Sequence, residues 1–149
     1  SPQIDLEHLD IPDEELLDQI GYRLLPIFEL AYGVKLDQAL QTVREEAALG
    51  QPPLEGDRAF HSAIVQACGN AVLVETVHSF WDARRGPLFT RLGGYFETPR
   101  SWRTALKEHQ TILAAIRAQD PVAARAAMHA HMDKSHHRLN ASWHSANPA

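Results

Sequence analysis

Asp57 and His61 stand four residues apart in a segment that otherwise has the pattern of a helix packed into a core. Four residues is a little more than one helical turn, so both side chains leave the same face. Phe60, Ile64 and Ala67 share that face. Because a buried carboxylate without a partner is costly, this face needs a cation, a hydrogen-bond network or a metal ion.

Two more histidines lie on the apolar stripes of predicted helices. His109 stands among the leucines and isoleucines of one stripe, and His131 lies between Met128 and Ser135 on another. One carboxylate and three imidazoles then point inward from three helices, which is how helix bundles build metal sites. This ligand set suits zinc, nickel, iron, manganese or cobalt and does not by itself choose among them; zinc is the metal that we expect. A metal that accepts five or six ligands would keep positions open for water or a small anion.

Two other interpretations of these residues compete with a metal-binding sensor. In the first, the histidines are satisfied core residues and the Asp57–His61 pair is a local ion pair. In the second, the chain is a metal-dependent, hydrolase-like enzyme whose open metal position activates water. An enzyme needs a general base beside the metal, but Glu108 precedes His109 and is expected to point elsewhere, and the sequence contains no His-Glu-x-x-His element.

The whole chain is acidic and has the length of one ordinary domain. It has 149 residues, a formal net charge of −5 and 44% hydrophobic residues, enough for a real core. Without a basic face, this piece is not expected to bind nucleic acid by itself. Cys68 is the only cysteine, which fits a reducing cytoplasm. No signal peptide is visible, and no apolar run approaches the ~20 residues of a membrane span, so we expect no membrane contact.

Helical periodicity and capping residues predict an all-α chain, because no segment alternates apolar and polar residues with period two. The first helix is expected over residues 12–32, interrupted at Pro26 and ended by Gly33. Further helices are expected over 36–49, from 54–57 to 69, and from 71 to 86 after an Asn70 N-cap. Residues 87–96 are expected to form a turn or two before Gly93-Gly94. Thr98-Pro99 and Asp120-Pro121 open the last two helices.

Four sequence segments carry a resemblance to a known family. They are Asp57-Arg-Ala-Phe-His61, Gly69-Asn70, Glu108-His109-Gln-Thr-Ile-Leu-Ala-Ala-Ile116, and residues 120–131, which end at His131. Together they resemble the FCD family, the C-terminal effector-binding domain of FadR-type transcription regulators in the GntR superfamily. The resemblance covers about residues 13–140.

The resemblance implies an antiparallel bundle of six or seven helices with a metal at its centre. Its ligands would be Asp57, His61, His109 and His131, beside a pocket for a small carboxylate effector. It further implies a homodimer that passes ligand binding to an N-terminal winged helix, which binds operator DNA. On this basis residues 1–10 are a linker remnant, residues 11–145 are the ligand-binding domain, and the winged helix is absent from this chain.

Two arginines are candidate effector-binding residues. Arg23 lies on the first predicted helix, where the family usually has an Arg with a Glu a few residues later. Here Pro26 intervenes and the nearest glutamate is Glu29. Arg84 ends the fourth predicted helix. Either guanidinium is suited to hold a carboxylate with a bidentate fork. The alternatives are an ion pair with Glu29 for Arg23, and capping of the helix C-terminus for Arg84.

Overall fold

The computed structural model describes residues 33–146, except for the side chains of residues 92–96, 142, 143, 145 and 146. Arg23 and the helix expected over residues 12–32 lie outside the described residues. The described part is all-helical and contains no strand, which confirms the predicted class. Its six helices are α2 (Gly33–Ala48), α3 (Leu54–Ala67), α4 (Ala71–Ala83), α5 (Pro87–Phe96), α6 (Pro99–Arg117) and α7 (Pro121–Ala146).

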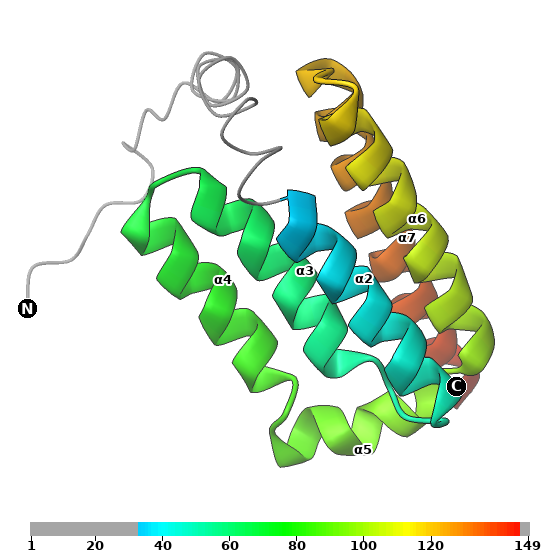
Figure 1. Cartoon of the computed structure of the whole chain (residues 1–149). Coiled ribbons are helices and arrows are strands. Elements are labelled where there is room, and N and C mark those ends of the chain that lie inside the picture. Colours follow the sequence, from blue (N-terminus) through cyan, green and yellow to red (C-terminus); the bar gives the residue numbers. More distant parts are fainter. Residues whose placement is uncertain (1–32, 147–149) are drawn as a thin grey trace, which may run out of the picture.

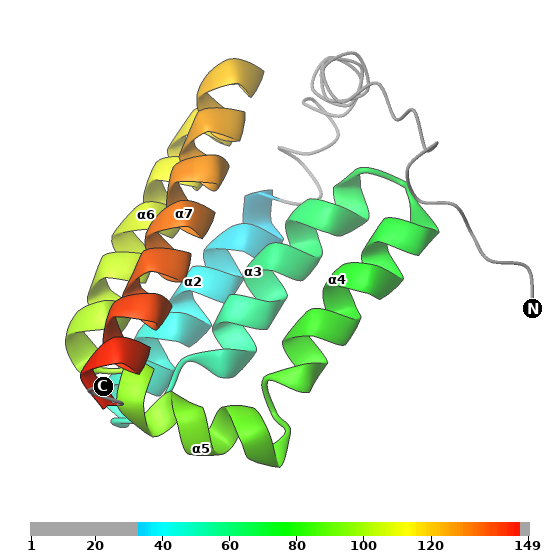
Figure 2. The same cartoon turned by 180° about the vertical axis from the view of Figure 1, so that it is seen from behind.

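The helices form two groups that meet along α2 (Figure 1). α2, α3 and α4 lie side by side, with α3 in contact with both neighbours. α6 and α7 form a long pair, and α6 packs against α2. α5 runs across one end of the molecule and contacts α7, as the reverse view also shows (Figure 2). None of the described helices is both long and apolar enough to span a membrane.

Several helix ends are fixed by the capping residues that the sequence predicted. The Asn70 side chain accepts a hydrogen bond of 3.1 Å from the backbone N–H of Leu73 at the start of α4. Thr98 and Ser101 form a reciprocal capping box at the start of α6. The Asp120 side chain accepts from a backbone N–H of the first turn of α7. Each interaction satisfies a donor that the helix itself leaves unpaired.

Two glycine signals led to wrong boundaries. Gly33 was expected to separate two helices, but it is itself part of α2, which includes three residues before the predicted start at residue 36. Gly93 and Gly94 were expected to limit residues 87–96 to a turn or two, but α5 continues through both to Phe96. A glycine inside a helix costs only about 1 kcal/mol relative to alanine. Contact between α5 and α7 can offset such a cost, whereas the local signal contains no information about that contact.

The core lies between α2, α3 and α6. Its fully buried side chains come from one face of each helix: Leu36, Ala39, Leu40, Phe60, Ala63, Ala67, Ile112 and Leu113. Burying one such leucine, isoleucine or phenylalanine side chain contributes roughly 1.5–3 kcal/mol. Because this cluster lies directly beside His61 and His109 in sequence, it also fixes the helix faces that carry them.

Two contacts set the start of α3, the helix that carries Asp57 and His61. A Cβ atom on Gly56 would lie 2.5 Å from the backbone nitrogen of Val43, so only glycine lets α2 approach this closely. The Glu46 carboxylate of α2 accepts hydrogen bonds from the backbone N–H groups of Glu55 (3.0 Å) and Gly56 (2.9 Å). An anion at a helix N-terminus is favoured by the helix dipole. α2 therefore positions the first turn of α3.

Candidate metal centre

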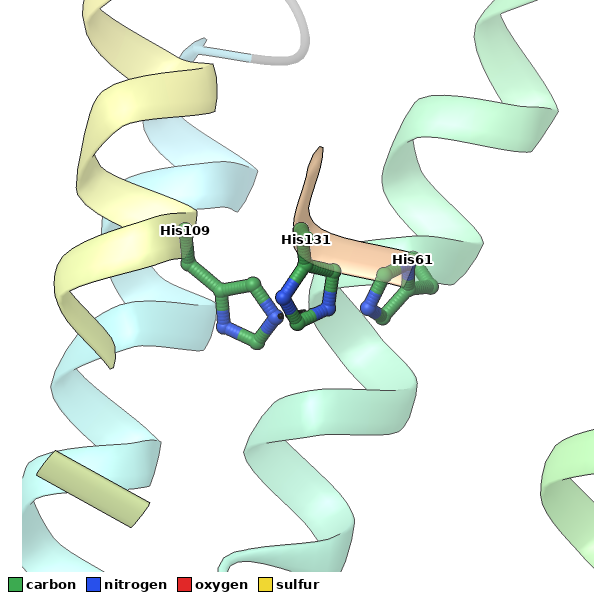
Figure 3. A group of neighbouring side chains, drawn as sticks. All are labelled: His61, His109 and His131. Atoms are coloured by element: carbon green, nitrogen blue, oxygen red, sulfur yellow. Dashed lines mark hydrogen bonds between the residues drawn. The ribbon is translucent and has the colours of Figure 1, made fainter. Parts of the chain in front are cut away.

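Three helices bring His61, His109 and His131 together in the interior. His61 comes from α3, His109 from α6 and His131 from α7, and their rings point toward one another (Figure 3). The three residues are 6%, 1% and 5% exposed. One nitrogen from each ring lies within 4.8 Å of the others, and the Nε2 atoms of His109 and His131 are 3.2 Å apart.

Asp57 joins this cluster through one carboxylate oxygen. Its Oδ1 lies 3.4 Å from the Nε2 of His109 and 3.7 Å from the Nε2 of His61. Its Oδ2 accepts hydrogen bonds from the indole N–H of Trp81, at 3.0 Å, and from the guanidinium of Arg84. The structure thus brings together all four residues that the sequence predicted as ligands.

The electrostatic environment keeps these groups in the forms that bind cations. Burial would raise the pKa of Asp57, but His61, Arg84, His109 and the Trp81 hydrogen bond hold it below its usual value. Burial lowers the pKa of His61 to about 4 and that of His109 to about 3, although Asp57 opposes both shifts. At neutral pH the carboxylate is therefore charged and both imidazoles are neutral, with a lone pair free for a metal.

The donor set fits a metal ion. The Nε2 atom of His61 is buried and has no hydrogen-bond partner, which is unusual for a buried polar atom. First-row divalent ions bind nitrogen and carboxylate oxygen at about 2.0–2.2 Å. Donor atoms 3.2–3.7 Å apart, as found for the His109–His131, Asp57–His109 and Asp57–His61 pairs, can therefore share one ion.

Glu108 also contacts the histidine cluster, which the sequence did not predict. It was expected to point elsewhere, but its Oε2 lies 2.8 Å from the Nδ1 of His131, on the far side of that ring from the cluster. Arg138 donates to both oxygens of Glu108, at 2.8 and 2.9 Å, and to the hydroxyl of Ser135. Burial would raise the pKa of Glu108, but the hydrogen bonds from Arg138 and His131 outweigh it and lower that pKa.

A signal for this network exists in the sequence. His131, Ser135 and Arg138 are spaced by four and three residues, so they share one face of α7. Glu108 is adjacent to His109 on α6, and α6 packs against α7. Arg138 lies seven positions after His131 on the same helix face. A charged residue at that position indicates that a buried acid, here Glu108, could lie opposite it.

A cavity of about 700 Å³ opens beside the cluster. All four predicted ligands line it, and Trp81 and Trp102 contribute aromatic walls. Its other charged lining residues are Arg84, Glu97 and Arg138.

Arg84 has a different role from a simple helix cap. It is the C-cap residue of α4, and it also lines the cavity. There it pairs with Asp57 and, at 2.7 Å, with Glu97, in the link between α5 and α6. The Asp57 and Glu97 carboxylates outweigh burial and raise the pKa of Arg84. Arg84 is thus a permanent cation at the cavity wall, held by two acids.

The chain is similar to a known protein family and to known transcription regulators. The family model of the FCD domain matches residues 34–134. The chain is 35% identical over 109 residues to the Uxu operon transcriptional regulator of Escherichia coli strain K12, which covers 71% of the chain and 42% of that protein. It is 28% identical over 141 residues to the Uxu operon regulator of Haemophilus influenzae, covering 87% of the chain and 53% of the relative. No solved structure matches.

The chain therefore spans about half the length of these regulators or less. The family match covers the helices that carry Asp57, His61, His109 and His131. On the family match and the identity to these transcription regulators, the chain belongs to the FCD family of GntR-type regulators.

Proposed function

We propose that this chain is the effector-sensing domain of a bacterial GntR/FadR-type transcription regulator, which binds a divalent metal ion and a small organic acid. The observation that carries the proposal is the convergence of three buried imidazoles and one carboxylate oxygen at the wall of a cavity. A purely structural histidine cluster would be expected to satisfy its buried nitrogens within the protein, yet the Nε2 of His61 has no hydrogen-bond partner.

The ion would be held by Asp57, His61, His109 and His131. Zinc is our first choice, and the same ligands suit nickel, iron, manganese and cobalt. When bound, the ion would supply a concentrated positive charge with coordination positions open to a ligand from the cavity. The chain's own contribution is to keep the imidazoles of His61 and His109 neutral by burial and the Asp57 carboxylate ionised beside Arg84.

The cavity suits a small anionic molecule. Its volume of about 700 Å³ lies within the roughly 300–1,000 Å³ range of small-molecule sites. Arg84 and Arg138 are both held in place by carboxylates, so their positive charges are already oriented before any ligand enters. Guanidinium groups are well suited to carboxylates. An organic acid that contacts the metal with one end would meet these cations at the cavity wall.

The regulatory role follows from the relatives. They are transcription regulators longer than this chain, so we infer that a winged-helix domain outside this chain binds operator DNA. We also infer that the protein acts in the cytoplasm as a homodimer. Acid binding would favour one arrangement of the helices and so one placement of the DNA-binding domains. The size of this effect equals the difference in acid affinity between the two arrangements.

A thermal-shift screen of small carboxylates tests the proposed function. Each acid is added to metal-loaded and to chelated protein purified without a His-tag. At a concentration a hundredfold above its Kd, a matching acid stabilises the folded state by about 2.7 kcal/mol. We expect this saturable stabilisation only in the metal-loaded protein, without turnover of the acid. Equal shifts with and without metal, or hydrolysis of ester, amide or phosphate substrates by the loaded protein, would contradict the proposal.

A further inference from the structure

Glu108 is a carboxylate buried between α6 and α7, where it has two sets of partners. Its side chain is only 9% exposed. Its Oε2 lies 2.8 Å from the Nδ1 of His131, and both of its oxygens accept hydrogen bonds from Arg138. Arg138 is anchored in turn to Ser135 at 2.9 Å. Arg138 thus holds the Glu108 carboxylate in place, and the same carboxylate contacts His131, a candidate metal ligand.

The contact selects one form of the His131 ring. A neutral imidazole carries its proton on either Nδ1 or Nε2, and the partner of one nitrogen decides which. An ionised carboxylate accepts hydrogen bonds and donates none. Glu108 therefore requires the proton on Nδ1, which leaves the lone pair on Nε2. That Nε2 lies 3.2 Å from the Nε2 of His109, on the side of the cluster.

The three imidazoles are not supported in the same way. The Nδ1 of His109 is buried and has no hydrogen-bond partner, so no carboxylate holds the far side of that ring. His131 in contrast comes from α7, which packs against α6 and α5. Its ring is linked back to α6 through Glu108. The bidentate Arg138 interaction fixes the plane of that carboxylate and so the orientation of the ring.

We propose that Glu108, held by Arg138, is a positioning residue that keeps His131 in the Nδ1–H form with its Nε2 directed at the metal site. This inference rests on the proposed metal-binding function and adds to it a determinant of metal affinity. Carboxylate partners of this kind orient histidine ligands and raise their basicity. Their loss typically weakens metal binding 10–100-fold.

The first test measures the tautomer of His131 without any metal. Long-range ¹H–¹⁵N correlation spectra of the metal-free full chain report which ring nitrogen carries the proton. We expect Nδ1–H for His131 in the unmodified chain, and a mixture or the Nε2–H form in Glu108→Ala. A His131 ring in the Nε2–H form in the unmodified chain would overturn the proposal.

The second test measures zinc affinity by competition with a chromogenic chelator. Glu108→Ala should bind zinc 10–100-fold more weakly than the unmodified chain, and Arg138→Ala should show a smaller loss. Glu75→Ala, at an exposed position of α4, and Arg117→Ala, which breaks an exposed pair with Asp37, serve as controls that should not change the affinity.

A conservative variant keeps the test decisive if Glu108→Ala does not fold. Glu108→Gln has the same size, and its amide oxygen still accepts from Nδ1, but it lacks the charge. We expect a severalfold loss of zinc affinity with the Nδ1–H form retained. Unchanged affinity in a folded Glu108 variant would overturn the proposal. If the unmodified chain binds no zinc but His131 is Nδ1–H and loses that form in Glu108→Ala, the proposed function fails while the positioning role stands.

Discussion

Asp57 uses its two carboxylate oxygens for different neighbours. Oδ1 lies 3.4 Å from the Nε2 of His109, whereas Oδ2 is occupied by Trp81 and Arg84. The residue is therefore held in place by α4 while it faces the histidines of α3 and α6. One charge both completes the candidate metal site and fixes the Arg84 guanidinium at the cavity wall.

Removal of a ligand should abolish tight metal binding. In Asp57→Ala and in His131→Ala we expect metal occupancy to fall well below that of the unmodified chain, and the melting temperature in the presence of metal to fall with it. The reason is that a ligand bound only by the folded state stabilises it. Occupancy is measured by elemental analysis after gel filtration. Asp82→Asn, which alters an exposed ion pair with Arg58, is the matched control. Full occupancy in both ligand variants would rule out this ligand set.

The sequence revealed the ligands but not their supports. The sequence identified His61, His109 and His131 as candidate ligands because each lies on the apolar stripe of a predicted helix. The helical period alone is enough to place them there. Glu108, Trp81 and Arg138 stand at positions that look solvent-facing or core-like along their own helices. Their roles depend on which helices lie side by side, and this information comes from tertiary packing. The same limit applies to Arg84, whose position at a helix end suggested a cap.

At the scale of the elements, α2 positions α3 through one glycine and one carboxylate. Gly56 allows the close approach, and Glu46 caps the first turn. Gly56 immediately precedes Asp57, and the Glu46 carboxylate binds the backbone of the two residues before Asp57. Changes here should therefore affect the metal site as well as stability, although neither residue is a ligand.

Gly56→Ala should destabilise the domain although alanine is the better helix former. The new Cβ would lie 2.5 Å from the backbone nitrogen of Val43, and a backbone atom cannot move aside as a flexible side chain can. We expect a loss of about 1–3 kcal/mol, the usual range for overpacking. Urea denaturation measures it. Gln66→Ala, at an exposed position of the same helix, controls for helix propensity. Equal stability of Gly56→Ala and the unmodified chain would show that α2 and α3 can separate freely.

Glu46→Ala should remove the cap of α3. Two backbone N–H groups would lose their acceptor, and loss of a helix N-cap costs about 0.5–2 kcal/mol. Glu45→Ala is the matched control, because Glu45 is an exposed neighbour whose carboxylate accepts from the Gln41 side chain at 3.0 Å. Thermal denaturation of both variants distinguishes them. A similar small change in the two would show that the cap does not contribute.

The helix boundaries were predictable where a side chain itself forms the cap. Asn70, Thr98 and Asp120 accept hydrogen bonds from backbone groups three residues later, so the signal and the interaction lie in the same short segment. Gly33 and Gly94 gave misleading signals for the opposite reason. A glycine permits a helix to end but does not require it, and contacts with other helices decide the outcome.

At the scale of the whole molecule, the histidine cluster lies where α3, α6 and α7 meet. α7 packs mainly against α6 and α5, so an ion held by His61 and His131 would join it directly to α3. Metal binding at this cluster would therefore strengthen the connection between the two groups of helices. This is the kind of link that lets a small ligand affect the arrangement of an entire domain.

Chelation should loosen α7 more than the core. After metal removal we expect faster hydrogen exchange around His131 and a lower melting temperature, while α2 around Leu36 and Leu40 stays protected. The reason is that α2 is held by buried apolar side chains, whereas the cluster links α7 to α3. Hydrogen-exchange mass spectrometry of loaded and chelated protein measures this. Uniform change along the chain would contradict a role of the ion in joining these helices.

The central claim is that Asp57, His61, His109 and His131 form one metal site. An anomalous difference map from crystals grown with zinc, collected above and below the zinc edge, tests it most directly. We expect one strong peak among Asp57 Oδ1 and the three ring nitrogens, at about 2.0–2.2 Å from each. A map with no peak there, or with zinc only at the exposed His136 and His137 of α7, would contradict it.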